Sequence, residues 1–414
     1  MSSISILPAE LLLYIFEGAV FNNSSRGLLE TTWEAPDERF WASGSQWPHP
    51  DVASLATRRT IIQVNRTWRK LSWGLYFDYL RIPEAIRGRE YASNLIAEVG
   101  VSDQERRKGT SRIDIAPTML EEDNIEVLLQ LVEVLNDVRI VSLTPTNCST
   151  VNDSGRDRLY QLLSSRFPQT LRRFAHIIHN PFSNCKSPGR LSVQLDTLDL
   201  VISECLNIPW LTPSYATLTS LHIHLAESPL ELNDLPALRH LGIHVGPSSP
   251  PLDPIGAAVL LQRNGKSLES LHMTAPAAFY GPRGKGWCGA WAHVLPLLLH
   301  HAPNVRVVTI PFDGLHTLYN QRLEHLTHIG IESPYAPFIG QPPTNLPYLF
   351  SKDRNNLPAL KVIRMMNEVN PVRVARRGGE SGRFDRWVSA RKTCEQLGVR
   401  LEDGNGKPIE ARFI

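Results

Sequence analysis

The sequence predicts an α/β chain in which a small bundle of three helices is followed by a solenoid of repeated strand, turn and helix units. Two observations predict this fold class. Apolar residues recur at helical spacing before residue 77, and a short apolar pattern typical of buried strands recurs from residue 138 onward. With 414 residues and 42% hydrophobic content, the chain is long enough to bury a core in both parts.

The first predicted helix begins at Pro8, whose fixed φ and missing N–H suit the first helical position. Its apolar residues recur at three-and-four spacing and are Leu11, Leu12, Ile15, Phe16, Ala19 and Val20. An isolated helix of this length is marginal in water, whereas burying each Leu, Ile or Phe side chain is worth about 1.5–3 kcal/mol. The stripe therefore needs a partner surface.

Two further helices complete the predicted bundle, and Asp51 is a suitable N-cap for the first of them. Their apolar residues are Leu55, Ile61, Ile62 and Val64 in one helix, and Trp68, Leu71, Leu75 and Tyr76 in the other. Residues 21–50 are rich in Asn, Ser, Trp and Pro and predict an irregular loop inserted between helices. We place this helical domain at residues 1–82.

These segments resemble an F-box, in the form common in the large F-box-like families of fungi. The family pattern begins with Leu-Pro-x-Glu, continues to an Ile-Phe pair and closes around a Trp. The matching residues here are Leu7, Pro8, Glu10, Leu13, Ile15, Phe16, Val64, Trp68 and Leu71. The sequence departs from the pattern at Asn65, where Cys or Ser is usual, and in the long inserted loop at 21–50.

The resemblance implies a docking surface for a Skp-type adaptor, which bridges to a cullin. The residues on or beside that surface would be Leu7, Pro8, Leu11, Ile15, Phe16 and Val64. Trp68 and Leu71 would instead close the core of the F-box bundle.

The second part of the chain repeats the pattern apolar-x-x-apolar-x-apolar. It occurs at Val138–Leu143, Leu195–Leu200, Leu218–Ile223, Leu238–Ile243, Leu268–Met273, Val305–Ile310, Leu326–Ile331 and Leu360–Met365. Each unit predicts a short strand whose last two apolar residues point into a shared core, while the residue between them points outward. The spacing resembles a degenerate leucine-rich repeat, without the usual Asn or Cys ladder after the strands. We place this substrate-recognition domain at residues 83–414.

Helices are predicted between the strands, at Glu121–Leu135 and Trp291–His300, and several strands follow a turn that contains Pro. A last helix over Ser381–Leu397, with Gly398 as its stop, is expected to cover the exposed core of the final repeat.

Histidines gather at the outward positions of neighbouring predicted strands, namely His222, His224, His244 and His272. Three interpretations are open: a recognition patch for a substrate protein, a metal site built on the His-x-His spacing, or solvent-facing residues with no special role. No carboxylate or Cys accompanies the cluster, so the sequence predicts no metal site.

Composition favours an intracellular protein that binds other proteins. A formal charge of +2 gives no electrostatic case for nucleic acid, and the sequence has no stretch long enough to predict a membrane span. The five cysteines form no Cys-x-x-Cys pair, which indicates reduced thiols in the cytoplasm or the nucleus. The glycine-rich run Gly281–Gly286 lacks the spacing of a phosphate-binding loop, and no catalytic motif or cofactor site is recognisable.

The sequence therefore predicts a non-catalytic substrate receptor of a Skp-cullin-F-box type ubiquitin ligase. The N-terminal module would bind the adaptor, and the repeat domain would bind an unknown target protein. One alternative is a ligase-independent interaction scaffold whose degenerate F-box serves only for packing. Another is an unrelated enzyme whose repeats are coincidental.

Overall fold

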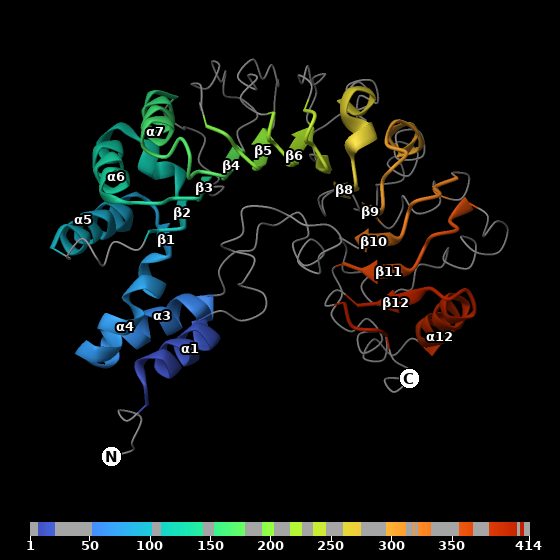
Figure 1. Cartoon of the computed structure of the whole chain (residues 1–414), viewed down its shortest axis with the longest axis horizontal. Coiled ribbons are helices and arrows are strands. Elements are labelled where there is room, and N and C mark those ends of the chain that lie inside the picture. Colours follow the sequence, from blue (N-terminus) through green and yellow to red (C-terminus); the bar gives the residue numbers. More distant parts are fainter. Residues whose placement is uncertain are drawn as a thin grey trace. The chain divides into compact units, whose positions relative to one another are not determined.

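A computed structural model describes residues 7–20, 52–101, 109–143, 153–178, 193–202, 216–225, 235–245, 260–274, 295–311, 318, 322–332, 356–366, 381–403 and 406–409. The inserted loop at 21–50 and the predicted cap Asp51 lie outside these residues. The chain forms two compact units, and the division falls after Leu200, within strand β5. Figure 1 shows the elements of both units.

Three helices begin the first unit, drawn in blue in Figure 1: α1 (Ala9–Val20), α3 (Val52–Val64) and α4 (Arg66–Phe77). Their shared core consists of Leu12, Phe16, Val20, Ile61 and Leu75. Leu13, Trp68 and Leu71 are partly buried against that core, and the rings of Phe16 and Trp68 lie 4.7 Å apart. The predicted three-helix bundle is thus present.

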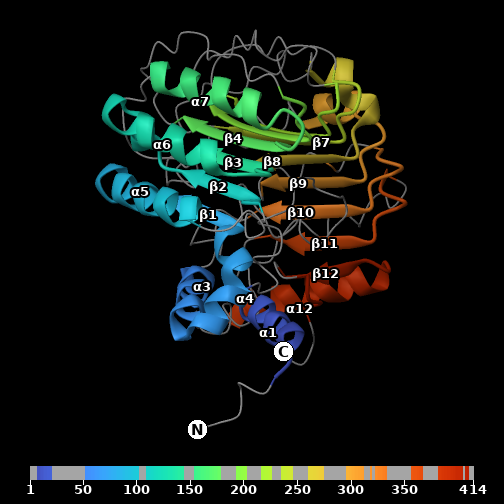
Figure 2. The same cartoon turned by 60° about the vertical axis from the view of Figure 1, so that its left-hand side comes forward.

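The first unit continues into a sheet whose strands lie in chain order. They are β1 (Tyr79–Ile82), β2 (Arg112–Ile115), β3 (Ile140–Leu143), β4 (Arg173–Ile178) and β5 (Thr197–Ile202), and pairing is parallel from β1 through β4. The helices α5 (Ala85–Val101), α6 (Glu122–Val134) and α7 (Asp153–Arg166) alternate with these strands. Figure 2 shows α6 lying between α5 and α7, with which it is in contact. The α6 helix has Glu121 and Leu135 as its caps, which confirms the predicted segment.

The second unit repeats the same arrangement. Its strands are β6 (Ser220–Leu225), β7 (His240–Val245), β8 (Ser270–Thr274), β9 (Val307–Pro311), β10 (His328–Glu332), β11 (Val362–Met365) and β12 (Arg400–Glu402), each parallel to the next. Residues 295–301 are helical, and α12 (Ser381–Gln396) packs against β12. Gly398 adopts a left-handed φ of 70°, as expected of the residue that stops this helix.

Every segment with the apolar repeat pattern contains a strand, so the predicted α/β architecture with a parallel sheet is confirmed. The Pro-containing turns before β7, β9 and β11 are also present, because the amide of the fourth turn residue donates to the carbonyl of the first. Those pairs are Leu238 to Leu235, Val305 to Ala302 and Leu360 to Leu357. Four strands were not predicted, namely β1, β2, β4 and β12. The first of these lies within residues 1–82, the span predicted as the helical domain.

A repeated backbone contact holds neighbouring units together, which we call the carbonyl clamp. A carbonyl just before one strand accepts hydrogen bonds from two successive amides at the start of the next strand. Arg239 accepts from Glu269 at 2.8 Å and Ser270 at 3.0 Å, and Arg306 accepts from Thr327 at 2.8 Å and His328 at 3.1 Å. The other double acceptors are Ser111, Arg139, Arg172, Thr219, Glu269 and Thr327. Since the clamp uses only main-chain groups, stacking does not require an Asn or Cys ladder.

In the described ranges of the chain, every helix is too short or too polar to span a membrane.

A buried ion pair lies in the first unit, on the face of β1 and β2. The Arg112 guanidinium donates to both carboxylate oxygens of Asp114, at 2.7 and 3.0 Å, and the Tyr79 hydroxyl donates to the same carboxylate at 2.7 Å. Arg112 and Asp114 are 0% and 1% exposed, and the guanidinium lies 5.5 Å from the centroid of the Tyr79 ring. Each charge is therefore neutralised within the sheet.

Replacing Arg112 by Met leaves the Asp114 carboxylate buried without its cation. We expect Arg112→Met to lower the free energy of unfolding by about 3–5 kcal/mol, and the double variant Arg112→Met/Asp114→Leu to recover part of that loss. Chemical denaturation followed by circular dichroism measures both. Arg139→Met is the matched control, because the Arg139–Asp137 pair is 54% and 49% exposed and contributes at most about 1 kcal/mol. An equal loss in the control would contradict this account.

Burial also affects a histidine of the second unit. His240 is 4% exposed, its Nδ1 lies 2.9 Å from the Ser270 hydroxyl, and burial lowers its pKa to about 4. The Glu269 carboxylate partly opposes this shift and Arg239 adds to it. The same cause lowers the pKa of His328 to about 4, with contributions from Arg364, Arg400 and Lys361.

A lowered pKa in the folded state means that the unfolded chain binds more protons between about pH 6.5 and 4. Stability should therefore decrease as the pH falls through this window, by up to about 1.4 kcal/mol per pH unit for His240. His240→Asn should flatten the decrease, measured as melting temperature at a series of pH values. His325→Asn, at an exposed position, is the control. Parallel curves for wild type and His240→Asn would contradict the assignment.

Candidate functional site

Large apolar side chains of helix α1 are buried on one side and exposed on another. Leu12, Phe16 and Val20 face the bundle core and are at most 5% exposed. On the other side lie Leu7, Leu11, Tyr14 and Ile15, which are 37%, 50%, 75% and 51% exposed, and we call these four residues the α1 apolar face. A helix that is apolar on both sides is usually covered on both.

Val64, at the end of α3, is the fifth exposed large apolar residue, with 51% of its surface accessible. Among the residues that the structure describes, every exposed large apolar side chain belongs to α1, to the two residues before α1 or to the end of α3. Helices α1 and α3 pack against each other. Scattered exposed apolar residues are ordinary, whereas a concentration of them on one small module indicates a contact surface.

Most residues predicted to lie at the adaptor surface are exposed, namely Leu7, Pro8, Leu11, Ile15 and Val64. Phe16 is a correction, because it is 2% exposed and packs on Trp68 inside the bundle. The cause is its spacing: Phe16 follows Leu12 by four residues and therefore lies on the buried side of α1. Tyr14 was missed, although its position three residues after Leu11 places it on the exposed side.

Asn65 explains how the bundle forms without the Cys or Ser expected at that position. Its side-chain oxygen accepts a 2.8 Å hydrogen bond from the amide of Trp68, and its carbonyl accepts a 3.0 Å bond from the amide of Arg69. Asn65 is therefore the N-cap of α4. The Arg69 side chain also donates to the Ile62 carbonyl at 3.0 Å, which ties the start of α4 to the end of α3.

Removing this cap should destabilise the start of α4. We expect Asn65→Ala to cost about 0.5–2 kcal/mol of stability, because the amide of Trp68 loses its acceptor. Hydrogen exchange measured by mass spectrometry over residues 66–72 should be faster in this variant. Asn65→Ser retains an acceptor and is the matched control, so a loss of similar size in both variants would contradict the capping role.

The predicted histidine patch is only partly present. His222 is half-buried, and its ring lies over Gly242 on the next strand, where an added Cβ would come within 2.5 Å of Nδ1. His224 and His244 are opposite each other in the register of β6 and β7, and their side chains lie outside the described set.

His272 is a correction, because it does not lie on an open surface. It is 2% exposed, and its Nε2 lies 3.0 Å from Oε1 of Glu332, which is also buried. Other central positions of the repeat pattern, Thr309 and Arg364, are likewise buried. Arg364 donates to Glu402 Oε2 at 3.0 and 2.7 Å. These positions do not form an exposed row, and two of their polar side chains, His272 and Arg364, pair with residues of other strands.

No group of three or more metal-ligating side chains is present among the residues that the structure describes.

The comparisons with known proteins add little to this picture. No protein-family model matches the sequence, and no curated protein matches it. Among solved structures, the leucine-rich repeat-containing protein LegL7 from Legionella pneumophila is similar over 80% of this chain and 92% of that chain, with 14% identity and a TM-score of 0.43. The class of the protein, an α/β repeat protein with an N-terminal helical bundle, follows from its own strands and helices.

Proposed function

We propose that the chain is a substrate receptor of a Skp-cullin-F-box type ubiquitin ligase, whose N-terminal helices form an F-box that docks a Skp-type adaptor. The observation that carries the proposal is the α1 apolar face. It lies beside the side of α1 that forms the bundle core, and it includes Leu7 and Ile15 of the F-box pattern and Leu11 of the predicted adaptor surface.

The energetics support a protein partner for this face. Full burial of a large apolar side chain provides roughly 1.5–3 kcal/mol, and the side chains of this face are about half exposed. A partner that covers the exposed half would therefore add about 1 kcal/mol per residue. Apolar side chains of this kind form the centre of protein interfaces, surrounded by a polar rim. Glu10 and Glu17 of α1 are exposed polar residues that fit such a rim.

The repeat sheet would present the target protein. Its parallel strands hold side chains at fixed positions, and His222, His224 and His244 remain candidate contacts for the target, whereas buried His272 is no longer one. In this proposal the chain performs no chemistry itself. It raises the effective concentration of the target near a charged conjugating enzyme, in the cytoplasm or the nucleus.

Co-purification tests the adaptor contact. We expect the full-length chain to form a stable complex with a Skp-type adaptor, and Leu11→Ser/Ile15→Ser to weaken that complex by at least about tenfold, because it removes apolar area worth more than about 1.4 kcal/mol. Size-exclusion chromatography and calorimetric titration measure the change.

Glu90→Ser is the matched control, since it changes an exposed residue of α5, outside the helical bundle, and should leave the affinity unchanged. Absence of a complex with the intact chain would overturn the ligase proposal and favour the ligase-independent scaffold. Circular dichroism of the double variant should match wild type, because both changed side chains are half exposed.

A further inference from the structure

A cavity of about 390 Å³ lies in the first unit, where the helical bundle meets the beginning of the sheet. Four arginines contribute to its wall: Arg58 and Arg59 from α3, Arg81 from β1 and Arg87 from α5. No carboxylate is among the described residues that line it. The whole chain carries a formal charge of only +2, so this concentration of positive charge is local.

Two nearby carboxylates, Asp114 and Asp78, already have partners of their own, and Glu98, which interacts electrostatically with Tyr91, does not line the cavity. Asp114 accepts from both Arg112 and Tyr79, and the Asp78 carboxylate accepts a 2.8 Å hydrogen bond from the Ser111 hydroxyl. Asp78 is near enough to Arg58 to interact electrostatically with it, but it does not line the cavity. The described lining of the cavity therefore offers no carboxylate to Arg59, Arg81 and Arg87.

Arg58 is buried in the cavity wall, and its contacts hold its side chain in place. It is 4% exposed, donates to the Leu75 carbonyl at 2.7 Å and lies 6.0 Å from the centroid of the Tyr79 ring. Burial lowers the pKa of its guanidinium, while Asp78 opposes that shift. A fixed cation beside three exposed ones creates mutual repulsion, which a bound anion would relieve.

The aromatic lining adds hydrogen-bonding groups. Tyr76 and Tyr91 are half-buried and interact through their hydroxyl groups. Burial is the main cause of the raised pKa of Tyr91, with Tyr76 adding to it, so this phenol stays protonated. Phenol hydroxyls donate hydrogen bonds to anionic oxygens as well as to each other.

We propose that this cavity binds a compact small molecule that carries two or more phosphate groups. Guanidinium groups form paired, charge-assisted hydrogen bonds with phosphate oxygens. A tetrahedral phosphate offers oxygens in several directions, which suits arginines arriving from α3, β1 and α5, whereas a planar carboxylate suits one guanidinium. The volume lies within the range of roughly 300–1,000 Å³ typical of small-molecule sites.

The proposal is independent of the adaptor contact. The ligand would join the helical bundle to the first strand and helix of the sheet, because the lining combines residues of α3 and α4 with residues of β1 and α5. Its binding should consequently stabilise the folded first unit.

Calorimetric titration of the full-length chain with inorganic tripolyphosphate tests the site. We expect saturable binding that weakens as salt is raised, and a higher melting temperature with the ligand. Arg81→Gln/Arg87→Gln should weaken binding by at least about tenfold, because each change removes a charge-assisted contact. Both side chains are exposed, so the ligand-free melting temperature should stay unchanged.

Arg89→Gln is the matched control, because Arg89 is an exposed arginine of the same helix that does not line the cavity. It should change the affinity by less than about twofold. No binding of tripolyphosphate to wild type, or an equal loss in Arg89→Gln, would overturn the proposal. Orthophosphate binding as tightly as tripolyphosphate would overturn the requirement for more than one phosphate. Retained adaptor binding by the Arg81→Gln/Arg87→Gln variant would show that the two sites are separate.

Discussion

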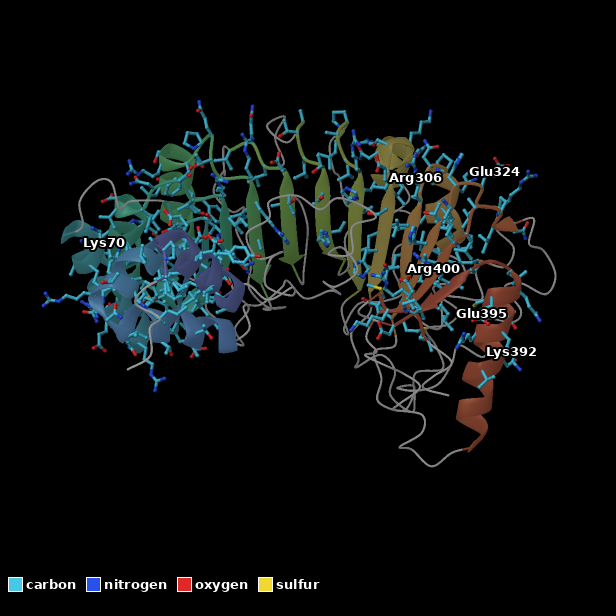
Figure 3. All side chains as sticks on the ribbon, turned by 60° about the horizontal axis from the view of Figure 1, so that its bottom comes forward. Lys70, Arg306, Glu324, Lys392, Glu395 and Arg400 are labelled. Carbon is cyan, nitrogen blue, oxygen red and sulfur yellow. The ribbon has the colours of Figure 1, made fainter. Side chains whose placement is uncertain are left out.

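The carbonyl clamp is the contact on which each stack of strands depends. In both units, a carbonyl before one strand accepts from two successive amides of the next, and the same two pattern positions supply these groups each time. The first of those positions is polar or charged in unit after unit, as at Arg239, Arg306 and Lys361, and Arg306 is labelled in Figure 3. The side chain there is unconstrained because the peptide groups make the contact. Apolar residues are needed only where the strand faces the core.

The different requirements at clamp positions and core positions explain which strands the sequence could predict. Strands with apolar residues at both core positions, such as Leu241 and Ile243, follow directly from the pattern. The strand β2 was missed because Arg112 and Asp114 alternate with its apolar residues and resemble a solvated segment, although both are buried. The strand β1 was missed because it follows α4 so closely that its residues resemble the end of the helical domain.

The candidate site was predictable to the extent that it depends on local spacing. Helical periodicity predicted one apolar stripe on α1, and the structure divides that stripe into a buried part with Leu12 and Phe16 and an exposed part with Leu11 and Ile15. His272 was misplaced for a different reason: its partner Glu332 is 60 residues away, and no local pattern connects the two. The arginine-lined cavity was equally hidden, since its residues come from α3, β1 and α5. Pairing of charges across strands also makes the register specific, because a slip by one residue would bury each charge without its partner.

A single residue, Asp78, separates the end of α4 from the beginning of β1. Its carbonyl accepts a hydrogen bond from the amide of Arg112 at 3.0 Å, and its carboxylate accepts one from the Ser111 hydroxyl at 2.8 Å. Both the main chain and the side chain of Asp78 are therefore bonded to residues at the start of β2. A one-residue connection fixed at both ends leaves no hinge between bundle and sheet within the first unit. A partner that binds α1 therefore also fixes the orientation of β1 and β2, because the bundle and these strands move as one rigid body.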